Sequence, residues 1–470
     1  MSIIIVGAGL VGFQVADRLI EEGKDVTIIE NDEVAARYAS SRLDCIVITG
    51  TGNNLDVLRK AGAEHAQYFI ALTGSDEINM ICCTLVAAEF NIPNKLARVR
   101  NAAYLDSQMA GRAYWGIDYM INPEVEAARA IMQQVDSGTR NYVMLFENLD
   151  IQIQCFTIDK DSPLVKQTIH NLAELFAVTF IIPVIQRDGG IVIPDGSSVI
   201  LEGDTIYIAA GENDFKEIQR HLGEEAPPTN KILLVGGGSI GKTVLHYLMK
   251  RQEGGFFRKL SQFIQRKSPR SVRVVERNYK KCKQLSELFP EALVIHADIS
   301  EENIFEEEGL NECNLLVTAT ENPELNIVTS LYARTIGIER AITLVRTENY
   351  TRIANELGLG ITISLKNTVV NSIVRYLLKG NITSIQSAAQ GIIDFLELQV
   401  DPGSEIIGNQ LKDIYLPPET IILYIKRQNE TFIPVGESLI EAEDHIIILA
   451  RKEHVPRIEE LVNSGEPSII

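Results

Sequence analysis

Residues 3–12 read IIIVGAGLVG, and residues 232–241 read ILLVGGGSIG. In each stretch an apolar, β-branched run enters a G-x-G-x-x-G turn, and a helical pattern follows it (FQVADRLIEEG and KTVLHYLMK). This order of strand, glycine turn and helix is the context that the dinucleotide fingerprint requires. The first glycine permits the tight turn, the second lets the backbone approach a pyrophosphate, and the third lets the helix pack closely on the strand. Each stretch therefore predicts the start of a Rossmann-like, doubly wound parallel sheet.

The repeat continues well beyond these two motifs. The motifs are offset by 229 residues, whereas ALTGSDEIN ending at Asn79 and TATENPELN ending at Asn326 are offset by 247. The difference predicts about 18 extra residues in the second copy, which we place around residues 251–270. The six cations and the apolar residues of that insertion suggest an amphipathic basic helix, although a solvated excursion fits the pattern as well.

A second, smaller module follows each of these units. IPDGSSVILEGDTIYIAA (193–210) and IPVGESLIEAEDHIIILA (433–450) match at a constant offset of 240 residues, and both alternate short apolar runs with turn signals. An acidic, proline-containing stretch near 223–230 is typical of a linker. The expected α/β architecture is two Rossmann-like domains, each followed by a small α+β domain: 1–123, 140–224, 229–369 and 385–468.

An acidic residue ends the second strand expected in each copy. Glu30 closes DVTIIE, 18 residues beyond Gly12, and Glu276 closes SVRVVE. A carboxylate there can accept hydrogen bonds from ribose hydroxyls and repels a 2′-phosphate, which favours NAD(H) or an adenine nucleotide over NADP. Arg277 follows Glu276 and makes that exclusion less secure in the second copy. A glycine motif can also be a purely structural turn, and a duplicated copy can persist only as scaffold.

Composition narrows the class of partner. The formal net charge of −19 disfavours nucleic acid and anionic lipid, but is compatible with a basic surface such as the cytoplasmic loops of a membrane protein. The six cysteines form no C-x-x-C, which predicts reduced thiols and no metal site. No sequence run approaches the roughly 20 apolar residues of a membrane-spanning helix, so we expect a cytoplasmic protein.

Several blocks carry a family resemblance that extends over essentially the whole chain. IIIVGAGLVG, TIIEND, ITGTGNN, ALTGSDEINM and ARVRN, then LLVGGGSIG, VVERN and TATENPELN, resemble the TrkA family of tandem RCK-domain (regulator of potassium conductance) proteins. The resemblance implies a non-enzymatic regulatory subunit that binds NAD(H) and ATP/ADP. It also implies a homotetrameric gating ring docked on the inner face of the cell membrane, on a TrkH/TrkG-like potassium-transporting subunit.

The resemblance also implies nucleotide-binding residues in both copies. In the first copy they are Gly7, Ala8, Gly9, Leu10, Val11, Gly12, Glu30, Thr73, Gly74, Arg98 and Arg100. In the second copy they are Gly236, Gly237, Gly238, Ser239, Ile240, Gly241, Glu276, Asp298, Thr320 and Arg346. Leu344 aligns with Arg98, so the second site lacks one cation. Alternatively, Arg98 and Arg100 are ordinary surface cations, and Thr73 and Thr320 cap the following helices.

Two other functions compete with the regulatory one. A soluble NAD-dependent oxidoreductase would need a substrate domain that offers a proton donor beside the nicotinamide. The modules that follow each Rossmann-like unit are short and strand-rich and show no evident acid/base pair, so we assign no catalytic residue. A pure interaction scaffold with unused nucleotide sites is the third hypothesis, and ligand-dependent thermal stabilisation would exclude it.

Overall fold

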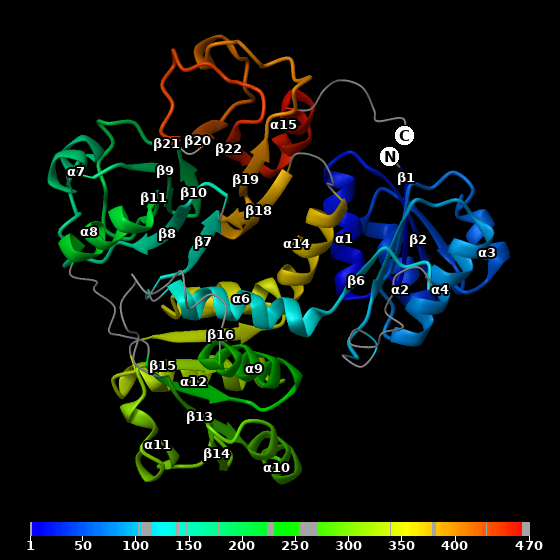
Figure 1. The fold of residues 1–470 in the computed structure, drawn as a ribbon, viewed down its shortest axis with the longest axis horizontal. Coiled ribbons are helices and arrows are strands. Elements are labelled where there is room, and N and C mark those ends of the chain that lie inside the picture. The colour runs from blue at the N-terminus through cyan, green and yellow to red at the C-terminus, as the bar shows by residue number, and fades with distance from the viewer. Residues whose placement is uncertain are drawn as a thin grey trace. The chain divides into compact units, whose positions relative to one another are not determined.

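The structure is a computed structural model, shown in Figure 1. It describes residues 2–101, 104, 115–137, 139, 141–146, 148–176, 178–222, 230–253, 270–338, 340–377, 382–428 and 430–462. The chain divides into two compact units. The first contains Met1–Ala127 and Leu365–Gly380, and the second contains Ala128–Ser364 and Asn381–Ile470.

A six-stranded parallel sheet forms the centre of the first unit. Ile3, Ile4 and Ile5 of its central strand are fully buried, as expected for a strand covered by helices on both faces. Its strands are β1 (Ser2–Val6), β2 (Asp25–Glu30), β3 (Ile46–Thr49), β4 (Tyr68–Ala71), β5 (Asn94–Arg98) and β6 (Tyr119–Ile121). The order β3-β2-β1-β4-β5-β6 reverses direction between β1 and β4, which places a crevice at the carboxyl ends of these strands.

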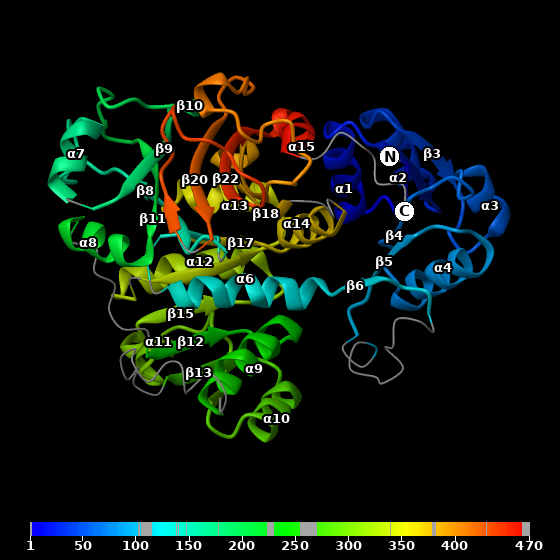
Figure 2. The same ribbon diagram turned by 45° about the horizontal axis from the view of Figure 1, so that its top comes forward.

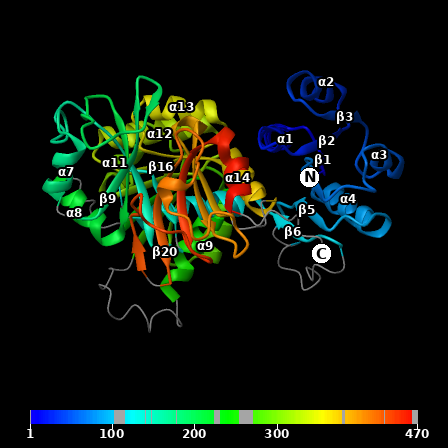
Figure 3. The same cartoon turned by 90° about the horizontal axis from the view of Figure 1, so that it is seen from above.

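Helices cover both faces of this first sheet. Figure 3 shows α1 and α2 on one face and α3 and α4 on the other. Their bounds are α1 (Leu10–Glu21), α2 (Glu33–Arg42), α3 (Leu55–Lys60) and α4 (Asp76–Glu89). This arrangement confirms the doubly wound fold class predicted for the first copy.

The second unit contains a parallel sheet with the same strand order. Its strands are β12 (Lys231–Val235), β13 (Ser271–Glu276), β14 (Leu293–His296), β15 (Leu315–Thr318), β16 (Ala341–Val345) and β17 (Ile361–Ser364). Its helices are α9 (Ser239–Glu253), α10 (Tyr279–Leu288), α11 (Ile304–Glu307), α12 (Pro323–Thr335) and α13 (Glu348–Glu356). The offset between copies rises from 229 at β1/β12 to 246 at β2/β13, so the insertion follows α9. Residues 254–269, where we expect the amphipathic basic helix, lie outside the described residues.

Two five-stranded antiparallel sheets complete the second unit. The first, in the order β10-β9-β11-β8-β7, contains β7 (Val143–Phe146), β8 (Ile151–Thr157), β9 (Phe180–Arg187), β10 (Gly190–Val192) and β11 (Thr205–Gly211). The second repeats this order with β18 (Ile382–Ala388), β19 (Ile393–Gln399), β20 (Ile421–Arg427), β21 (Glu430–Phe432) and β22 (His445–Arg451). Helices α7 (Ile169–Phe176) and α8 (Glu212–Leu222) belong to the first of these modules, and α15 (Val455–Val462) to the second.

The two antiparallel modules share one hydrophobic core. Figure 1 and Figure 2 show the sheets next to each other, and Phe146 and Ile153 of one belong to the same buried cluster as Phe395 of the other. Buried tyrosines tie the modules together. The Ala389 N–H donates to Tyr207 Oη at 3.0 Å, and Tyr424 Oη donates to the Ala209 carbonyl at 3.0 Å. These modules therefore stabilise each other.

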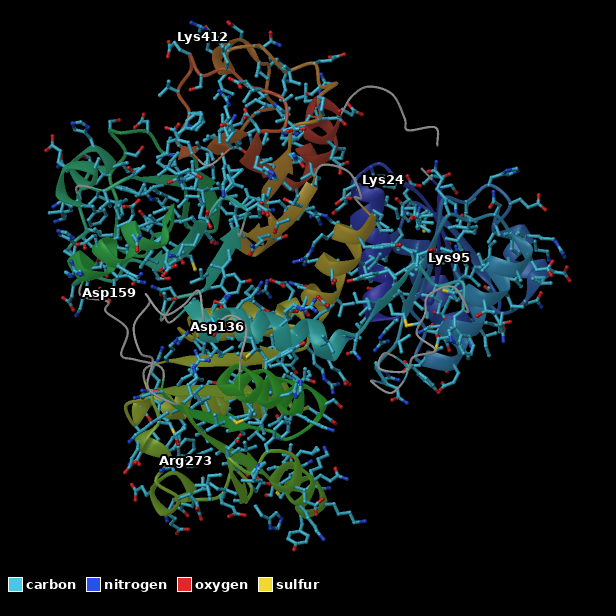
Figure 4. The ribbon with its side chains drawn as sticks, viewed as in Figure 1. Lys24, Lys95, Asp136, Asp159, Arg273 and Lys412 are labelled. Atoms are coloured by element: carbon cyan, nitrogen blue, oxygen red, sulfur yellow. The ribbon has the colours of Figure 1, made fainter. Side chains whose placement is uncertain are left out.

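A helix follows the last strand of each parallel sheet and makes contacts outside that sheet. Helix α14 (Leu365–Leu377) follows β17 but packs in the first unit against α1 and β6, where the rings of Tyr119 and Tyr376 stack at 4.5 Å. Helix α6 (Pro123–Ser137) follows β6. In its last turn, Asp136, labelled in Figure 4, accepts a hydrogen bond from Arg270 at 3.3 Å.

A buried carboxylate stabilises the corresponding corner of each antiparallel module. Asp204 accepts hydrogen bonds at 2.7 Å from Arg187 Nε and Nη2, and at 2.8 Å from the Leu201 N–H. Asp444 and Arg427 repeat the arrangement at the offset of 240 residues. Burial alone would raise the pKa of Asp204, but these hydrogen bonds and the Arg187 charge outweigh it, so the pKa lies below its ordinary value.

We predict that Asp204→Asn destabilises the second unit by about 2–3 kcal/mol. This is less than the ~3–5 kcal/mol typical of a broken buried ion pair, because Arg187 keeps some contact with solvent. A folded-state pKa below the unfolded value means that the stabilisation is present above about pH 4 and is lost as the pH falls through the folded-state pKa. Urea unfolding at pH 7 and pH 3 measures both effects. Glu202→Gln, which neutralises an exposed carboxylate two residues away, is the control and should change little.

Candidate nucleotide-binding site

The glycine turn after β1 has two separate steric requirements. Gly7 has φ +102° and Gly236 has φ +104°, a region that glycine adopts without strain. A Cβ on Gly12 would lie 1.9 Å from the carbonyl oxygen of Gly7, and Gly241 repeats this distance. The close contact made by the third glycine is therefore with the turn itself. This corrects our expectation of close packing on the strand, because the nearest strand side chain, Ile5, would be 3.8 Å away.

The start of α1 is open for an anion. Gly9 precedes the helix in an extended conformation and makes no side-chain capping bond, so the first N–H groups have no cap. A Cβ on Gly9 or on Gly238 would meet nothing within 4 Å. The structure places Leu10 and Val11, and likewise Ser239 and Ile240, in the first turns of α1 and α9. These helix starts have the geometry that binds phosphate in other nucleotide sites.

Glu30 and Glu276 close this turn from the neighbouring strand. Glu30 accepts hydrogen bonds from the Ala8 N–H at 2.5 Å and from the Asp32 N–H at 2.9 Å. Glu276 accepts from the Gly237 N–H at 2.7 Å and from the Asn278 N–H at 2.7 Å. The N–H groups of Ala8 and Gly237, which we expected to contact phosphate, therefore bind these carboxylates in this structure. Each carboxylate oxygen still has a lone pair for a ribose hydroxyl.

The two glycine turns differ in the size of one turn residue and of the helix residue that packs against it. A Cβ on Gly237 would lie 2.5 Å from Cδ1 of Leu285 in α10. In the first copy the equivalent residues are Ala8 and the fully buried Ala39. A larger residue in the helix is thus balanced by a smaller one in the turn, which preserves the geometry of the second crevice.

A buried asparagine shapes the opposite wall of each crevice. Asn79 Oδ1 accepts from the N–H and Oγ1 of Thr73 at 2.8 and 2.7 Å, and its Nδ2 donates to the Arg98 carbonyl at 2.9 Å. Asn326 makes the same contacts with Thr320 and with the Leu344 carbonyl. These contacts confirm the alignment of Arg98 with Leu344. The alternative that the threonines cap helices is wrong, since Ser75 caps α4 and Asn322 caps α12.

The two arginines after β5 have different surroundings. Arg100 is exposed, and its guanidinium donates to the Gly74 carbonyl at 2.7 Å and lies 3.7 Å from Asp76. Arg98 is half-buried, and its Nε has no hydrogen-bond partner among the described residues. Burial lowers the pKa of Arg98, and the neighbouring Arg100 lowers it further. Both guanidiniums therefore contact the wall, Arg98 through the Thr73 carbonyl at 3.4 Å, but the Nε of Arg98 remains a buried donor without a partner among the described residues.

The second crevice has a cleft of about 440 Å³ beside Asp298. Hydrogen bonds from the N–H and hydroxyl of Ser300 lower the pKa of Asp298, so this group is an anion at neutral pH. Arg346, expected at this site, is exposed, while Leu344 is buried. Arg277, which the sequence placed directly after Glu276, also lines the cleft. Sequence reasoning missed the remaining lining residues: Asn278, His296, Ala297 and Glu301.

Two kinds of feature are absent from the residues that the structure describes. Within them, no group of three or more His, Cys, Asp or Glu side chains is arranged to hold a metal ion. No helix in the described part of the chain has the length and apolar character needed to cross a membrane.

We predict opposite consequences for alanine at two glycines of the first turn. Gly12→Ala should lower the free energy of unfolding by about 1–3 kcal/mol, because its Cβ overlaps the Gly7 carbonyl oxygen. Gly9→Ala should leave stability within about 0.5 kcal/mol, because its φ of −66° suits alanine and the space is open. Gly9→Ala should instead weaken nucleotide binding at least tenfold in calorimetry. Equal stability of the two variants would contradict the steric argument.

Comparison with known proteins agrees with this geometry. The TrkA-N domain matches residues 3–123 and 232–365, and the TrkA-C domain matches 154–223 and 395–463. The Trk system potassium uptake protein TrkA of Azorhizobium caulinodans is 27% identical and covers 98% of both chains. That of Halomonas elongata is 28% identical and covers 99% of both chains.

Solved structures show the same fold. The crystal structure of the GsuK RCK domain has a TM-score of 0.55 at 16% identity, covering 98% of this chain and 94% of that chain. The GsuK channel bound to NAD has a TM-score of 0.55 at 15% identity, covering 98% and 78%. Because the two TrkA-N matches alone span more than half of the sequence, the chain belongs to the TrkA family, with TrkA-N and TrkA-C domains in tandem.

Proposed function

We propose that this chain is a regulatory subunit that senses NAD(H) and ATP/ADP and controls a membrane potassium-transporting subunit. The observation that carries the proposal is the half-buried Arg98, whose Nε is unpartnered among the described residues, at the end of β5 beside Thr73. A buried donor without a partner is costly, and a ligand phosphate would satisfy it. We infer that the transported ion is potassium from the relatives, which are named for Trk potassium uptake.

The nucleotide is held by backbone and side chains from both walls of each crevice. In the first copy, the backbone of the glycine turn and the first turn of α1 bind the phosphates, and Glu30 binds the ribose. Thr73 and Gly74 form the opposite wall of the crevice. In the second copy, Gly236 to Gly241, Glu276, Asp298, Thr320 and Arg346 take the corresponding roles. Arg98 reads the groups beyond the adenosine, and its replacement by Leu344 gives the two sites different preferences.

The chain works without catalysis, as a homotetrameric gating ring on the cytoplasmic face of the cell membrane. Its partner is a TrkH/TrkG-like subunit, whose basic cytoplasmic loops complement the acidic charge of this chain. A nucleotide shifts the ring only by its different affinity for two states of the ring. The same coupling free energy must appear as a change in nucleotide affinity when the partner binds.

Potassium flux through proteoliposomes that contain the membrane subunit tests this function directly. Flux should change when the chain is added and should then depend on whether ATP, ADP or NADH is present. Oxidation of NADH by the purified chain in the presence of candidate carbonyl substrates would support the oxidoreductase instead. A potassium flux that is unchanged by the chain and by all three nucleotides would contradict the proposal.

We predict that Arg98→Ala reduces ATP affinity about 10- to 100-fold, while ADP affinity falls less. A charge-assisted hydrogen bond to a terminal phosphate contributes about 1.5–3 kcal/mol, and the smaller nucleotide lacks that phosphate. Calorimetry measures both affinities, and thermal unfolding checks that the fold is intact. Arg98→Lys should retain part of the discrimination, because the charge remains.

Arg100→Ala is the matched control for this variant, since that guanidinium already donates to Gly74. It should change the ratio of ATP to ADP affinity by less than about threefold, because an exposed and already engaged cation contributes little. If Arg98→Ala retained the wild-type ratio, Arg98 would not read the terminal phosphate.

A further inference from the structure

The two crevices have opposite charge at the corner where the second strand meets the second helix. Residues 30–35 read ENDEVA and carry three carboxylates, whereas residues 276–281 read ERNYKK and carry one carboxylate and three cations. Both segments occupy the same place, from the end of β2 or β13 into the first turn of α2 or α10. The formal charge of this corner therefore changes from −3 to +2 between copies that share the same strand order and the same glycine-turn geometry.

One cation of this corner lines the second crevice and has no partner among the described residues. Arg277 is exposed and lines the cleft of about 440 Å³. Its guanidinium makes no hydrogen bond or ion pair with any described residue, although its charge helps to lower the pKa of Asp298 across the cleft. The equivalent residue of the first copy is the neutral Asn31. An unpaired guanidinium beside a ribose-binding carboxylate is suited to a phosphate group.

Two lysines extend this positive surface at a cost to the helix. Lys280 and Lys281 lie in the first turn of α10, where the helix dipole disfavours cations. The equivalent turn of α2 contains Glu33, which the dipole favours. Neither lysine forms an ion pair with a described residue. An anion bound at this corner would offset the unfavourable placement.

The remaining groups of the cleft suit an adenosine. His296 Nε2 lies 3.1 Å from the Arg277 carbonyl, which can only accept, so this nitrogen donates and fixes the backbone beside the cation. Asp298 and Glu301 line the cleft as acceptors, which is the chemistry that an exocyclic amino group of a base requires. Both oxygens of Glu276 accept backbone N–H groups, which offsets part of its charge toward a nearby phosphate.

We propose that the second crevice binds an adenosine nucleotide that carries an additional phosphate on its ribose, at the 2′ or 3′ position. The first crevice, with Glu30, Asp32 and Glu33 at the same corner, excludes that phosphate. The proposal rests on the proposed nucleotide-sensing function and assigns the two sites to two classes of nucleotide. The first site responds to ATP, ADP or NAD(H), and the second site responds to a nucleotide whose ribose carries the additional phosphate.

Calorimetry on the full chain in two backgrounds tests this assignment. Gly9→Ala weakens the first site and Gly238→Ala weakens the second, and both methyl groups fit the structure without contacts within 4 Å. The probes are 5′-AMP, adenosine 2′,5′-bisphosphate and adenosine 3′,5′-bisphosphate. In the Gly9→Ala background one bisphosphate should bind at least tenfold more tightly than 5′-AMP, and the isomer that does so shows which ribose position is read. In the Gly238→Ala background neither bisphosphate should bind more tightly than 5′-AMP.

An exchange of residues between the copies provides the matched control. In the Gly9→Ala background, R277N alone should reduce the preference, and R277N/K280V/K281A should abolish it, while 5′-AMP affinity changes less than threefold. The swap uses the residues of the first copy, and thermal unfolding checks its fold. Unchanged preference in the triple variant, or 5′-AMP binding without gain from either bisphosphate, overturns this inference and leaves nucleotide sensing intact. Failure of every probe to bind in either background overturns the proposed function as well.

Discussion

The close approach of Gly12 to the carbonyl oxygen of Gly7 is the constraint on which both crevices depend. With no Cβ between them, α1 begins directly after the turn, and its first N–H groups lie at the carboxyl end of β1. The positive φ of Gly7 sets the direction of the turn, and Glu30 ties that turn to the end of β2. The second copy repeats each of these contacts, so the geometry of the turn is the same in both copies although several side chains of the motif differ.

The glycine turn and the acidic residue that ends the next strand could be predicted from the sequence, because they depend on residues close together in the chain. The contacts that Gly12 and Glu30 make with the turn could not. The glycine spacing, the strand that precedes it and the acidic residue that ends the next strand predicted the doubly wound sheets and the identity of the crevice. The opposite wall was predicted less well. The ALTGSDEIN block contributes to the family resemblance, which implies Thr73 but not Asn79, whose amide binds the carbonyl of Arg98, 19 residues away. Such partners across neighbouring strands have no local signal.

Contacts between modules could not be predicted for a similar reason. The shared core of the antiparallel sheets joins Phe146 to Phe395, and the tyrosine contacts between these modules join residues 182 and 215 positions apart. The packing of α14 against α1 likewise joins residues more than 300 positions apart. Alternation of apolar residues shows that a strand or helix has a buried face, but it does not say which element covers that face.

Duplication explains how one geometry can support two kinds of site. The exchange of Ala8 and Ala39 for Gly237 and Leu285 keeps the turn packed, so the backbone can remain while the charges beside it change. Helix α1 has the proposed phosphate site at its N-terminus and packs against α14, and both helices belong to the first unit. A nucleotide that moved α1 would therefore change its packing with α14, and α14 continues directly from β17 of the second sheet. Because packed helices adopt discrete arrangements rather than deforming continuously, the packing of α1 against α14 within the first unit is where we expect a difference between ligands to become a difference between states.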